Sequence, residues 1–95
     1  SRMNDCRHAI RERLKLDMEY TRADGAASSR VIHPLGLFFW GSVWTLVGWC
    51  ELRDNFRHFR LDRIQAMQLL SEHYEIQSGG SLDDYLQLVR CENEA

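Results

Sequence analysis

The first twenty residues change from a helical to a strand-like spacing of apolar side chains. In residues 4–14 the apolar positions recur with helical spacing, and Asn4 is a residue type that caps helices, so a short amphipathic helix is predicted. In residues 15–20 apolar and charged side chains alternate, which is the two-residue period of a strand with one solvent-exposed face. The sequence therefore predicts a helix that leads directly into a first strand.

A tight turn and a second strand are expected next. Asp24 and Gly25 form a dipeptide typical of two-residue hairpin turns. Residues 28–34 then predict the returning strand. Pro34 should end this strand or move it to a sheet edge, because proline has no amide hydrogen for the strand ladder.

Residues 31–50 contain no Asp, Glu, Lys or Arg. Such a run has the length of a membrane-spanning helix, about 20 residues, and arginines follow it as a cytoplasmic flank would. Proline, glycine and serine interrupt the run, however, and two apolar stretches, 35–40 and 43–50, lie on either side of Gly41 and Ser42. Short apolar stretches joined by a two-residue turn are typical of a β-hairpin, so we expect a hairpin and no membrane span.

Residues 52–64 are compatible with two structures. Apolar and arginine side chains each recur with helical spacing, as in an amphipathic helix. The alternative is a turn at 53–55 followed by a strand, in which Arg57 and Arg60 point to opposite faces of the sheet. Hydrophobic spacing alone leaves this choice open.

The last third of the chain predicts one more strand, a flexible joint and a second helix. Residues 66–70 can add a final strand, and the glycine-rich residues 78–81 form a joint. Ser81 is the expected N-cap of a helix over 81–91, whose acidic first turn suits the helix dipole.

The net charge of −2 conceals an uneven distribution. Residues 1–70 contain eleven Lys or Arg against eight Asp or Glu, whereas residues 71–95 contain one arginine against six acids. Lys15 is the only lysine, so the body relies on arginine, whose planar guanidinium suits carboxylate and phosphate. The overall balance does not fit a protein that coats nucleic acid through a strongly basic surface.

The spacing of cysteine and histidine argues against a metal site or a disulfide framework. Three cysteines and four histidines are scattered along the chain, with no CxxC pair. Free thiols and the lack of a cleavable apolar leader favour a cytoplasmic location. No Ser-His-Asp or Cys-His arrangement, HExxH motif or glycine-rich phosphate loop is legible, so neither enzyme activity nor a cofactor is expected.

Residues 5–75 resemble the WYL domain, which follows helix-turn-helix DNA-binding modules in bacterial DeoR-like regulators. The matching features are Arg30, PLGL at 34–37, the tripeptide positions Trp44 and Leu46, and FRLDRI at 59–64. The sequence departs from the family at Thr45, where the tripeptide has tyrosine. A β-branched threonine suits a strand, but a contact made by the tyrosine ring could not be made here in the same way.

The resemblance implies a fold and a role. The fold would be mostly β, a small SH3/Sm-like β-barrel of about five strands with a short N-terminal helix and a C-terminal helix, so residues 52–64 would contain a strand. Residues 4–77 would form the WYL-like domain, and residues 78–95 a linker and the acidic start of an extension. The role would be to sense an effector and to pass the signal to an N-terminal helix-turn-helix module, which is absent from this fragment.

The arginines are the best candidates for effector binding. We expect an anionic effector, a nucleotide or single-stranded nucleic acid, because guanidinium groups bind phosphate through two parallel hydrogen bonds. The candidate ligand-binding residues are Arg53, Arg57, Arg60 and Arg63, with Arg30, Tyr20, His33 and Trp44 beside them.

The alternative interpretation is a solvated strand edge without a ligand. The arginines would then pair with Glu51, Asp54 and Asp62, at about 0–1 kcal/mol for each exposed pair. Arg63 with Asp62 is the expected structural pair. Phe59 and Cys50 are expected in the core.

A second hypothesis for the function is a protein–protein interaction module without its own small ligand. The C-terminal helix and an aromatic sheet edge would mediate dimerisation, and a homodimer is the expected assembly.

Overall fold

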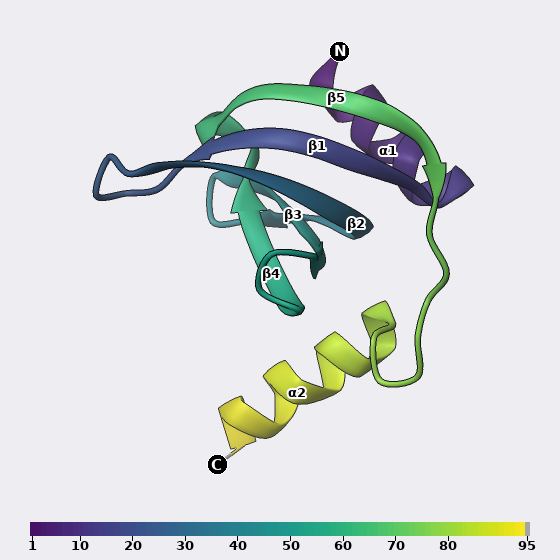
Figure 1. Cartoon of the computed structure of the whole chain (residues 1–95). Coiled ribbons are helices and arrows are strands. Elements are labelled where there is room, and N and C mark those ends of the chain that lie inside the picture. Colours follow the sequence, from purple (N-terminus) through teal and green to yellow (C-terminus); the bar gives the residue numbers. More distant parts are fainter. Residues whose placement is uncertain (95) are drawn as a thin grey trace.

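Five antiparallel strands form one sheet, with a helix on each side of it. The structure is a computed structural model that describes residues 1–94, with the side chains of residues 1–90. Residue 95, where the predicted C-terminal segment 78–95 ends, lies outside the described residues. In chain order the elements are α1 (Arg2–Glu12), β1 (Leu14–Thr21), β2 (Ala27–Trp40), β3 (Val43–Cys50), β4 (Asn55–Arg60), the 3-10 helix η1 (Leu61–Arg63), β5 (Ile64–His73) and α2 (Leu82–Glu94) (Figure 1).

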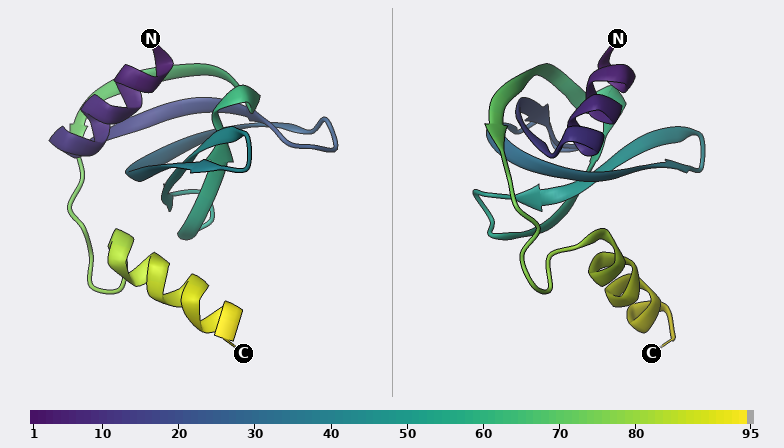
Figure 2. Two further views of the ribbon diagram at one scale, coloured as in Figure 1. Left: turned by 180° about the vertical axis from the view of Figure 1, so that it is seen from behind. Right: turned by 90° about the vertical axis from the view of Figure 1, so that its right-hand side faces the viewer.

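The strands lie in the order β4-β3-β2-β1-β5, and every neighbouring pair is antiparallel. β4 and β5 are the two edge strands, and within the described residues they do not pair with each other, so the sheet is not closed. The predicted strand number and the two helices are therefore confirmed, whereas the expected SH3/Sm-like β-barrel is not confirmed, because the sheet is not closed. Figure 2 places α1 beside β1 and β5, and α2 at the far end of the molecule.

β2 runs through Pro34 without interruption, so the prediction that the strand ends there was wrong. Pro34 lies at a shift in the β2–β3 register between Pro34 and Gly36, which is a bulge. A bulge accepts a proline inside a sheet because the ladder is already disturbed at that point. The extra residue also reverses the alternation, so that both Ile32 and Leu37 face the core.

Both predicted hairpin turns are present. Gly25, between β1 and β2, has a φ of 87°, and Gly41, between β2 and β3, has a φ of 64°. Both values lie in the left-handed region, which glycine adopts without a steric penalty. The Gly41–Ser42 turn joins β2 to β3, as the two apolar stretches predicted.

The resemblance-based choice for residues 52–64 is confirmed, because they hold a strand and a short 3-10 helix. A turn over 51–54 precedes β4, with Asp54 at a φ of 51°. Phe59 on β4 is buried, whereas Arg57 and His58 are exposed. The helical spacing of the arginines therefore did not indicate a helix.

The two helix N-termini differ in how well they were predicted. α1 begins at Arg2, and its cap is Ser1, whose side chain accepts a hydrogen bond from the amide of Asn4, so Asn4 is not the cap. At α2 the predicted cap is confirmed. Ser81 Oγ accepts from the Asp84 amide at 3.1 Å, and Asp84 Oδ2 accepts from the Ser81 amide at 3.0 Å, which forms a reciprocal capping box.

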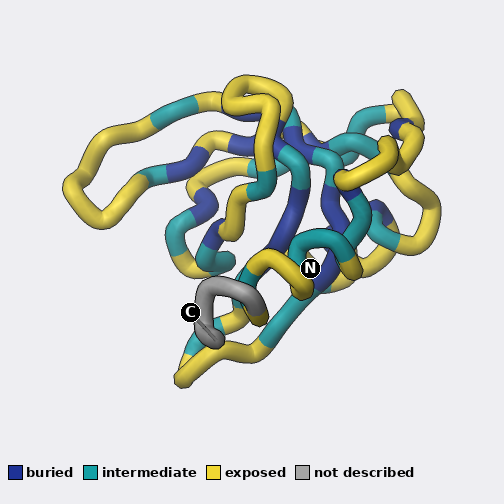
Figure 3. Tube along the Cα trace, turned by 90° about the horizontal axis from the view of Figure 1, so that it is seen from below, coloured by how far each residue is buried: buried dark blue, intermediate teal, exposed yellow. Residues whose placement is uncertain are grey.

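The core lies between α1 and one face of the sheet, which we call the inner face. Figure 3 shows buried segments of several strands lying side by side. The core residues include the predicted Phe59 and Cys50 and are Cys6, Ala9, Leu16, Met18, Tyr20, Ile32, Leu46, Cys50, Phe59 and Ile64. Within residues 1–94 no helix is long and apolar enough to cross a membrane.

β3 packs tightly against β2 at Gly48. A Cβ atom on Gly48 would lie 2.6 Å from Ile32 Cγ2 and 2.7 Å from the His33 carbonyl oxygen. Both distances are shorter than van der Waals contact, so only glycine fits without a shift of the neighbouring strand.

Candidate functional site

The sheet separates the predicted arginines into two groups. Arg57 pairs with Gly48 and lies on the inner face with Phe59, whereas Arg60 pairs with Thr45 on the opposite, outer face. Arg30 also lies on the inner face, because its guanidinium carbon is 5.9 Å from the centre of the Phe59 ring. Arg30 and Arg57 therefore share the inner face of the sheet, and Arg60 lies on the other face.

Arg30 is a buried cation, with only 7% of its surface exposed. Its Nε donates to Ser28 Oγ at 3.0 Å, and its Nη1 lies 3.8 Å from Cys50 Sγ. Within the described side chains Arg30 forms no ion pair with a carboxylate. Arg30 therefore places a positive charge near the core without a carboxylate of the described side chains to balance it.

One nitrogen of this guanidinium has no partner within the described residues. Every fully buried side-chain nitrogen or oxygen of the described residues has a hydrogen-bond partner. Arg30 Nη2 has no hydrogen-bond partner among them. Nη2 must therefore retain access to solvent.

Tyr20 forms part of the wall around Arg30. Its ring meets Phe59 edge to face, with 5.0 Å between centroids, and its hydroxyl accepts a hydrogen bond from the Arg60 backbone amide at 3.1 Å. The hydroxyl thus ties the end of β4 to β1, and Tyr20 is only 8% exposed. Tyr20 positions the strand that carries Arg57, which is a structural contribution to the candidate site.

The other inner-face arginine and two neighbouring arginines have no carboxylate partner. Arg57 on β4, Arg53 in the preceding turn and Arg63 in η1 form no side-chain hydrogen bond or ion pair within residues 1–90. Glu51 and Asp54, two of the acids expected to neutralise this cluster, do not pair with it. Among these four arginines of the described side chains, Arg60 alone is neutralised by a neighbouring acid, as the interpretation of a solvated strand edge expected.

Arg60 is occupied by Asp62. Its Nε and Nη2 donate to the two carboxylate oxygens of Asp62 at 3.0 and 2.7 Å. This hydrogen bonding holds the pKa of Asp62 below its ordinary value. The expected structural pair of Asp62 with Arg63 was wrong, because the fork geometry of two parallel hydrogen bonds is met by Arg60 across the start of η1.

His33 lies on the outer face, in a network of its own. Its Nε2 is 2.7 Å from Glu51 Oε2, and the same carboxylate lies 2.9 Å from Lys15 Nζ, which also pairs with Glu72. Hydrogen bonds from Lys15 first and His33 second lower the pKa of Glu51 below its ordinary value. Nothing in this network joins His33 to the inner-face arginines.

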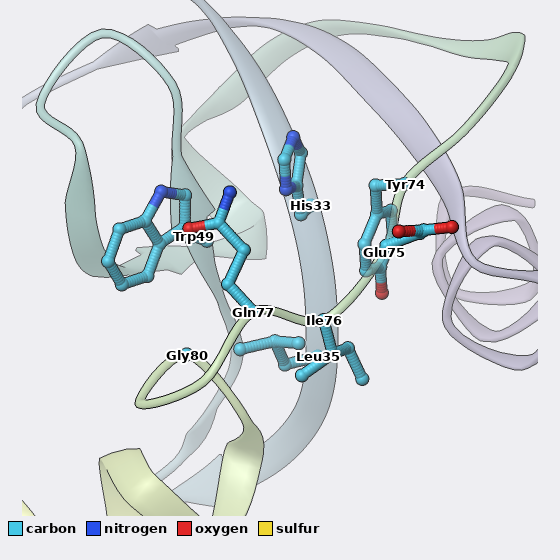
Figure 4. Close-up of a pocket in the computed structure, with 8 residues that line it drawn as sticks. All are labelled: His33, Leu35, Trp49, Tyr74, Glu75, Ile76, Gln77 and Gly80. Carbon is cyan, nitrogen blue, oxygen red and sulfur yellow. The ribbon is translucent and has the colours of Figure 1, made fainter.

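The His33 ring also anchors the segment that follows β5. It stacks on Tyr74, with 4.7 Å between centroids, and the Tyr74 hydroxyl donates to the Pro34 carbonyl. Figure 4 shows His33, Trp49 and Tyr74 around the small cavity beneath this segment. Its volume of about 10 Å³ is enough for a single water molecule and excludes an organic ligand.

Trp44 lies near the tip of the β2–β3 hairpin, opposite Phe39. Its ring meets Phe39 edge to face at 5.3 Å, and both side chains are exposed. The two exposed rings form an aromatic tip, which could contact another protein or stack on a nucleic-acid base.

The described cysteines are structural. Cys6 and Cys50 are both buried and free, and burial raises the pKa of the Cys6 thiol to about 11. Within the described residues no group of three or more His, Cys, Asp or Glu side chains could hold a metal ion. The side chain of Cys91 lies outside the described residues.

Sequence reasoning underrated Arg30 and missed the network around Lys15. One signal was available for Arg30, because it shares strand parity with the apolar Ile32 and so belongs to the core face. No local signal connects Lys15, Glu51 and Glu72, because the network joins the ends of three different strands.

Comparisons with known proteins agree with this architecture. A model of the WYL domain family matches residues 2–69. The uncharacterized HTH-type transcriptional regulator YobV of Bacillus subtilis (strain 168) is 30% identical over 66 residues, which cover 70% of this chain and 21% of the regulator. The chain thus spans about a fifth of the length of this relative.

A solved structure extends the agreement to three dimensions. The proteasome accessory factor B/C (PafBC) of Arthrobacter aurescens superimposes with a TM-score of 0.73 at 25% sequence identity, over 78% of this chain and 12% of that protein. The family model covers well over half of the 95 residues, including Arg30 and the whole of β4. This chain belongs to the WYL domain family.

Proposed function

We propose that this domain is the effector-sensing part of a transcriptional regulator and that it binds an anionic effector, a nucleotide or single-stranded nucleic acid, at Arg30 and Arg57. The observation that carries the proposal is the buried guanidinium of Arg30, which has no carboxylate partner within the described side chains. A phosphate bound there would supply the missing negative charge. The family membership and the HTH-type relative support the regulatory context.

Hydrogen-bonding capacity supports phosphate as the bound group. Arg30 uses Nε and Nη1 within the protein, which leaves the N–H groups of the solvent-accessible Nη2. Arg57 emerges two residues from Phe59 on the same face with its whole guanidinium unpaired. Two guanidinium groups at different depths suit one phosphate near Arg30 and the next phosphate of a chain near Arg57.

Arg53 and Arg63 would extend the positive surface along the chain of phosphates. Both are unpaired within the described side chains, and they flank β4 at its two ends. In the proposal Arg60 retains its pair with Asp62 and serves the fold, and His33 does the same through Glu51. No catalytic step is assigned to the domain.

Effector binding would act on transcription by a shift in population. The proposed N-terminal helix-turn-helix module would sample two arrangements relative to this domain, and an effector that binds one arrangement more tightly favours it. The proposed contacts of Arg53 and Arg63 lie in the turn before β4 and in η1 after it. Effector binding would therefore restrain these two connections, which are not part of the strand ladder.

Fluorescence anisotropy with short, end-labelled single-stranded oligonucleotides tests the proposal at several salt concentrations. We expect binding that weakens with salt, with a slope of about −0.7 for each phosphate contact. Arg57→Ala should weaken binding about tenfold, which corresponds to about 1.4 kcal/mol, and should reduce the salt slope by about one contact.

Arg22→Ala is the matched control, because Arg22 is an exposed arginine in the β1–β2 turn that already pairs with Asp24, whereas Arg57 has no such partner. Arg60→Ala is the second control, on the outer face of the sheet. No binding of oligonucleotides or of inorganic pyrophosphate would rule out the anionic effector. Equal losses for Arg57→Ala and Arg22→Ala would rule out the site.

Dimerisation through the aromatic hairpin tip is a second candidate function, favoured by the exposure of Phe39 at 59% and of Trp44 at 37%. Exposed aromatic pairs of this kind are enriched at protein interfaces. Light scattering after size exclusion, with the wild type and with a Phe39→Ser, Trp44→Ser double variant, measures it. A monomeric wild type at high micromolar concentration would exclude this function for the isolated domain.

A further inference from the structure

The outer face of the sheet holds a groove that the anion site does not use. It has a volume of about 330 Å³ and lies between α2 and the β2–β3–β4 part of the sheet. This size is at the lower end of the range for small-molecule sites, roughly 300–1,000 Å³. It is far larger than the single-water cavity near Tyr74.

Near its N-terminal end α2 packs on the sheet through Leu82 and Tyr85. Leu82 packs on Gly36, where its Cδ2 atom would lie 3.1 Å from a Cβ at that position, and the Tyr85 ring meets Phe56 at 5.4 Å between centroids. Leu86, one residue beyond Tyr85, remains 40% exposed, and Leu86 and Val89 line the groove together with side chains of the sheet. Apolar side chains of the helix and of the sheet thus face each other across an open space.

The walls of the groove are mainly aromatic and apolar, with polar groups at one side. Phe38 and Trp40 from β2 form the sheet wall, and Trp40 is 69% exposed. Leu86 and Val89 form the helix wall. His58 lies at the groove with its Nδ1 3.3 Å from the Tyr85 hydroxyl.

Thr45 lines the groove at the position where the family tripeptide has tyrosine. A tyrosine side chain pointing to the outer face from this position would occupy part of the space. The smaller threonine leaves that space open in this chain and adds a hydroxyl group beside His58.

We propose that this groove binds the planar heteroaromatic ring of a small molecule, inserted between Trp40 and α2 with its polar edge toward Thr45 and His58. Two flat aromatic side chains and an apolar helix face suit a planar ring more than a branched aliphatic chain, because ring stacking adds attraction beyond the buried area. The hydroxyl of Thr45 and the imidazole of His58 each donate or accept a hydrogen bond, which a heteroaromatic ring requires and a hydrocarbon does not. Among the described residues no arginine lines the groove, and Arg60, which lies opposite Thr45 on the same face, is already paired with Asp62, so the ring need not be charged.

The ring could belong to a free heteroaromatic compound or to a nucleoside, and two uncharged probes distinguish these sources. Binding of a fluorinated indole is measured by fluorine NMR, and binding of adenosine by amide chemical shifts of the 15N-labelled domain. We expect millimolar or tighter binding of at least one probe, with shifts confined to Thr45, Val47 and the α2 residues near Leu86. The stronger binder identifies the source of the ring.

Thr45→Tyr and Leu86→Glu are designed to block the groove, and Thr45→Val is their control. Thr45→Tyr should weaken binding at least tenfold because its ring occupies the space, whereas Thr45→Val keeps the volume and should lower affinity only about threefold through the lost hydroxyl. Leu86→Glu adds a charge at an exposed helix position and should also abolish binding without unfolding the domain. Oligonucleotide affinity should not change in any of them, which separates this site from the anion site.

Two results would overturn the inference. One is the absence of binding of both probes at millimolar concentration to a wild-type domain that is folded by amide dispersion. The other is equal probe affinity in the wild type and in Thr45→Tyr. Failure of the oligonucleotide experiment alone would leave these outcomes unaffected, because the groove and Arg30 lie on opposite faces of the sheet.

Discussion

Replacing Arg30 by methionine tests whether the charge of Arg30 serves ligand binding or the stability of the fold. Methionine has a similar length, carries no charge and suits irregular apolar sites. If Arg30 is retained to bind an anion, then Arg30→Met should stabilise the free domain and abolish effector binding. If Arg30 is retained for the fold, the variant should lose stability.

The contacts of Arg30 give the magnitude. Burying a cation in this setting costs several kcal/mol, about 4. The hydrogen bond to Ser28 returns about 2 kcal/mol, because one partner is charged. The Phe59 ring, 5.9 Å from the guanidinium carbon, returns about 1 kcal/mol. The remaining cost is about 1 kcal/mol, so Arg30→Met should raise the free energy of unfolding by about that amount.

Urea unfolding followed by tryptophan fluorescence measures the change, with and without a 5′-phosphorylated oligonucleotide. A ligand at one hundred times its dissociation constant should stabilise the wild type by about 2.7 kcal/mol. The same addition should leave Arg30→Met unchanged. Arg22→Met, at an exposed arginine, is the control and should alter neither quantity.

The reasoning would be refuted by the opposite combination of results. A variant that loses about 2 kcal/mol or more of stability and still gains the wild-type increment on adding oligonucleotide would show that Arg30 serves the fold.

Three further predictions concern the scaffold of the site. Gly48→Ala should destabilise the domain by about 1–3 kcal/mol in urea unfolding, because its methyl group would overlap Ile32 and the strand behind it; an unchanged midpoint would contradict the close approach of β2 and β3. Tyr20→Phe should cost about 1–2 kcal/mol, because the Arg60 amide loses its acceptor, and amide hydrogen exchange at Arg60 should accelerate; retained protection there would show that another acceptor takes over. The pKa of Glu51 lies below its ordinary value of 4.5 in the folded state, so this carboxylate stabilises the fold above pH 4.5 and its contribution is lost as the pH falls through the lowered pKa. Acid unfolding of Glu51→Gln should therefore be less steep below about pH 4.5 than that of the wild type, and coincident curves would show that the Lys15 and His33 contacts add no stability.

The local pattern of the sequence determined most of the secondary structure. Alternation of apolar and charged residues in 15–20 identified β1, and the turn residues Gly25 and Gly41 identified the ends of the hairpins. These features depend on neighbours in the chain, because strand alternation and left-handed turn conformations are local properties. The resemblance to the WYL domain then resolved the helix-or-strand ambiguity of residues 52–64.

Two details that the sequence did not predict correctly were decided by the backbone geometry of the folded chain. Pro34 was expected to end β2 or to move it to a sheet edge, but a bulge against β3 lets the strand continue, and β2 is the central strand of the sheet. Asp62 was expected to pair with Arg63, but the geometry at η1 pairs it with Arg60. In each case the partner or the strand register, not the residue type, set the outcome.

The candidate site shows the same division. The sequence by itself supplied an arginine cluster, the lack of lysine and the rule that a strand divides such a cluster between two faces. Only the fold decided which arginines have no carboxylate partner among the described side chains. Asp62 pairs with Arg60, whereas Glu51 pairs with Lys15 and His33 and with none of the arginines. Only the fold buried Arg30 against Phe59, since that contact brings together strands whose order in the sheet no local pattern encodes.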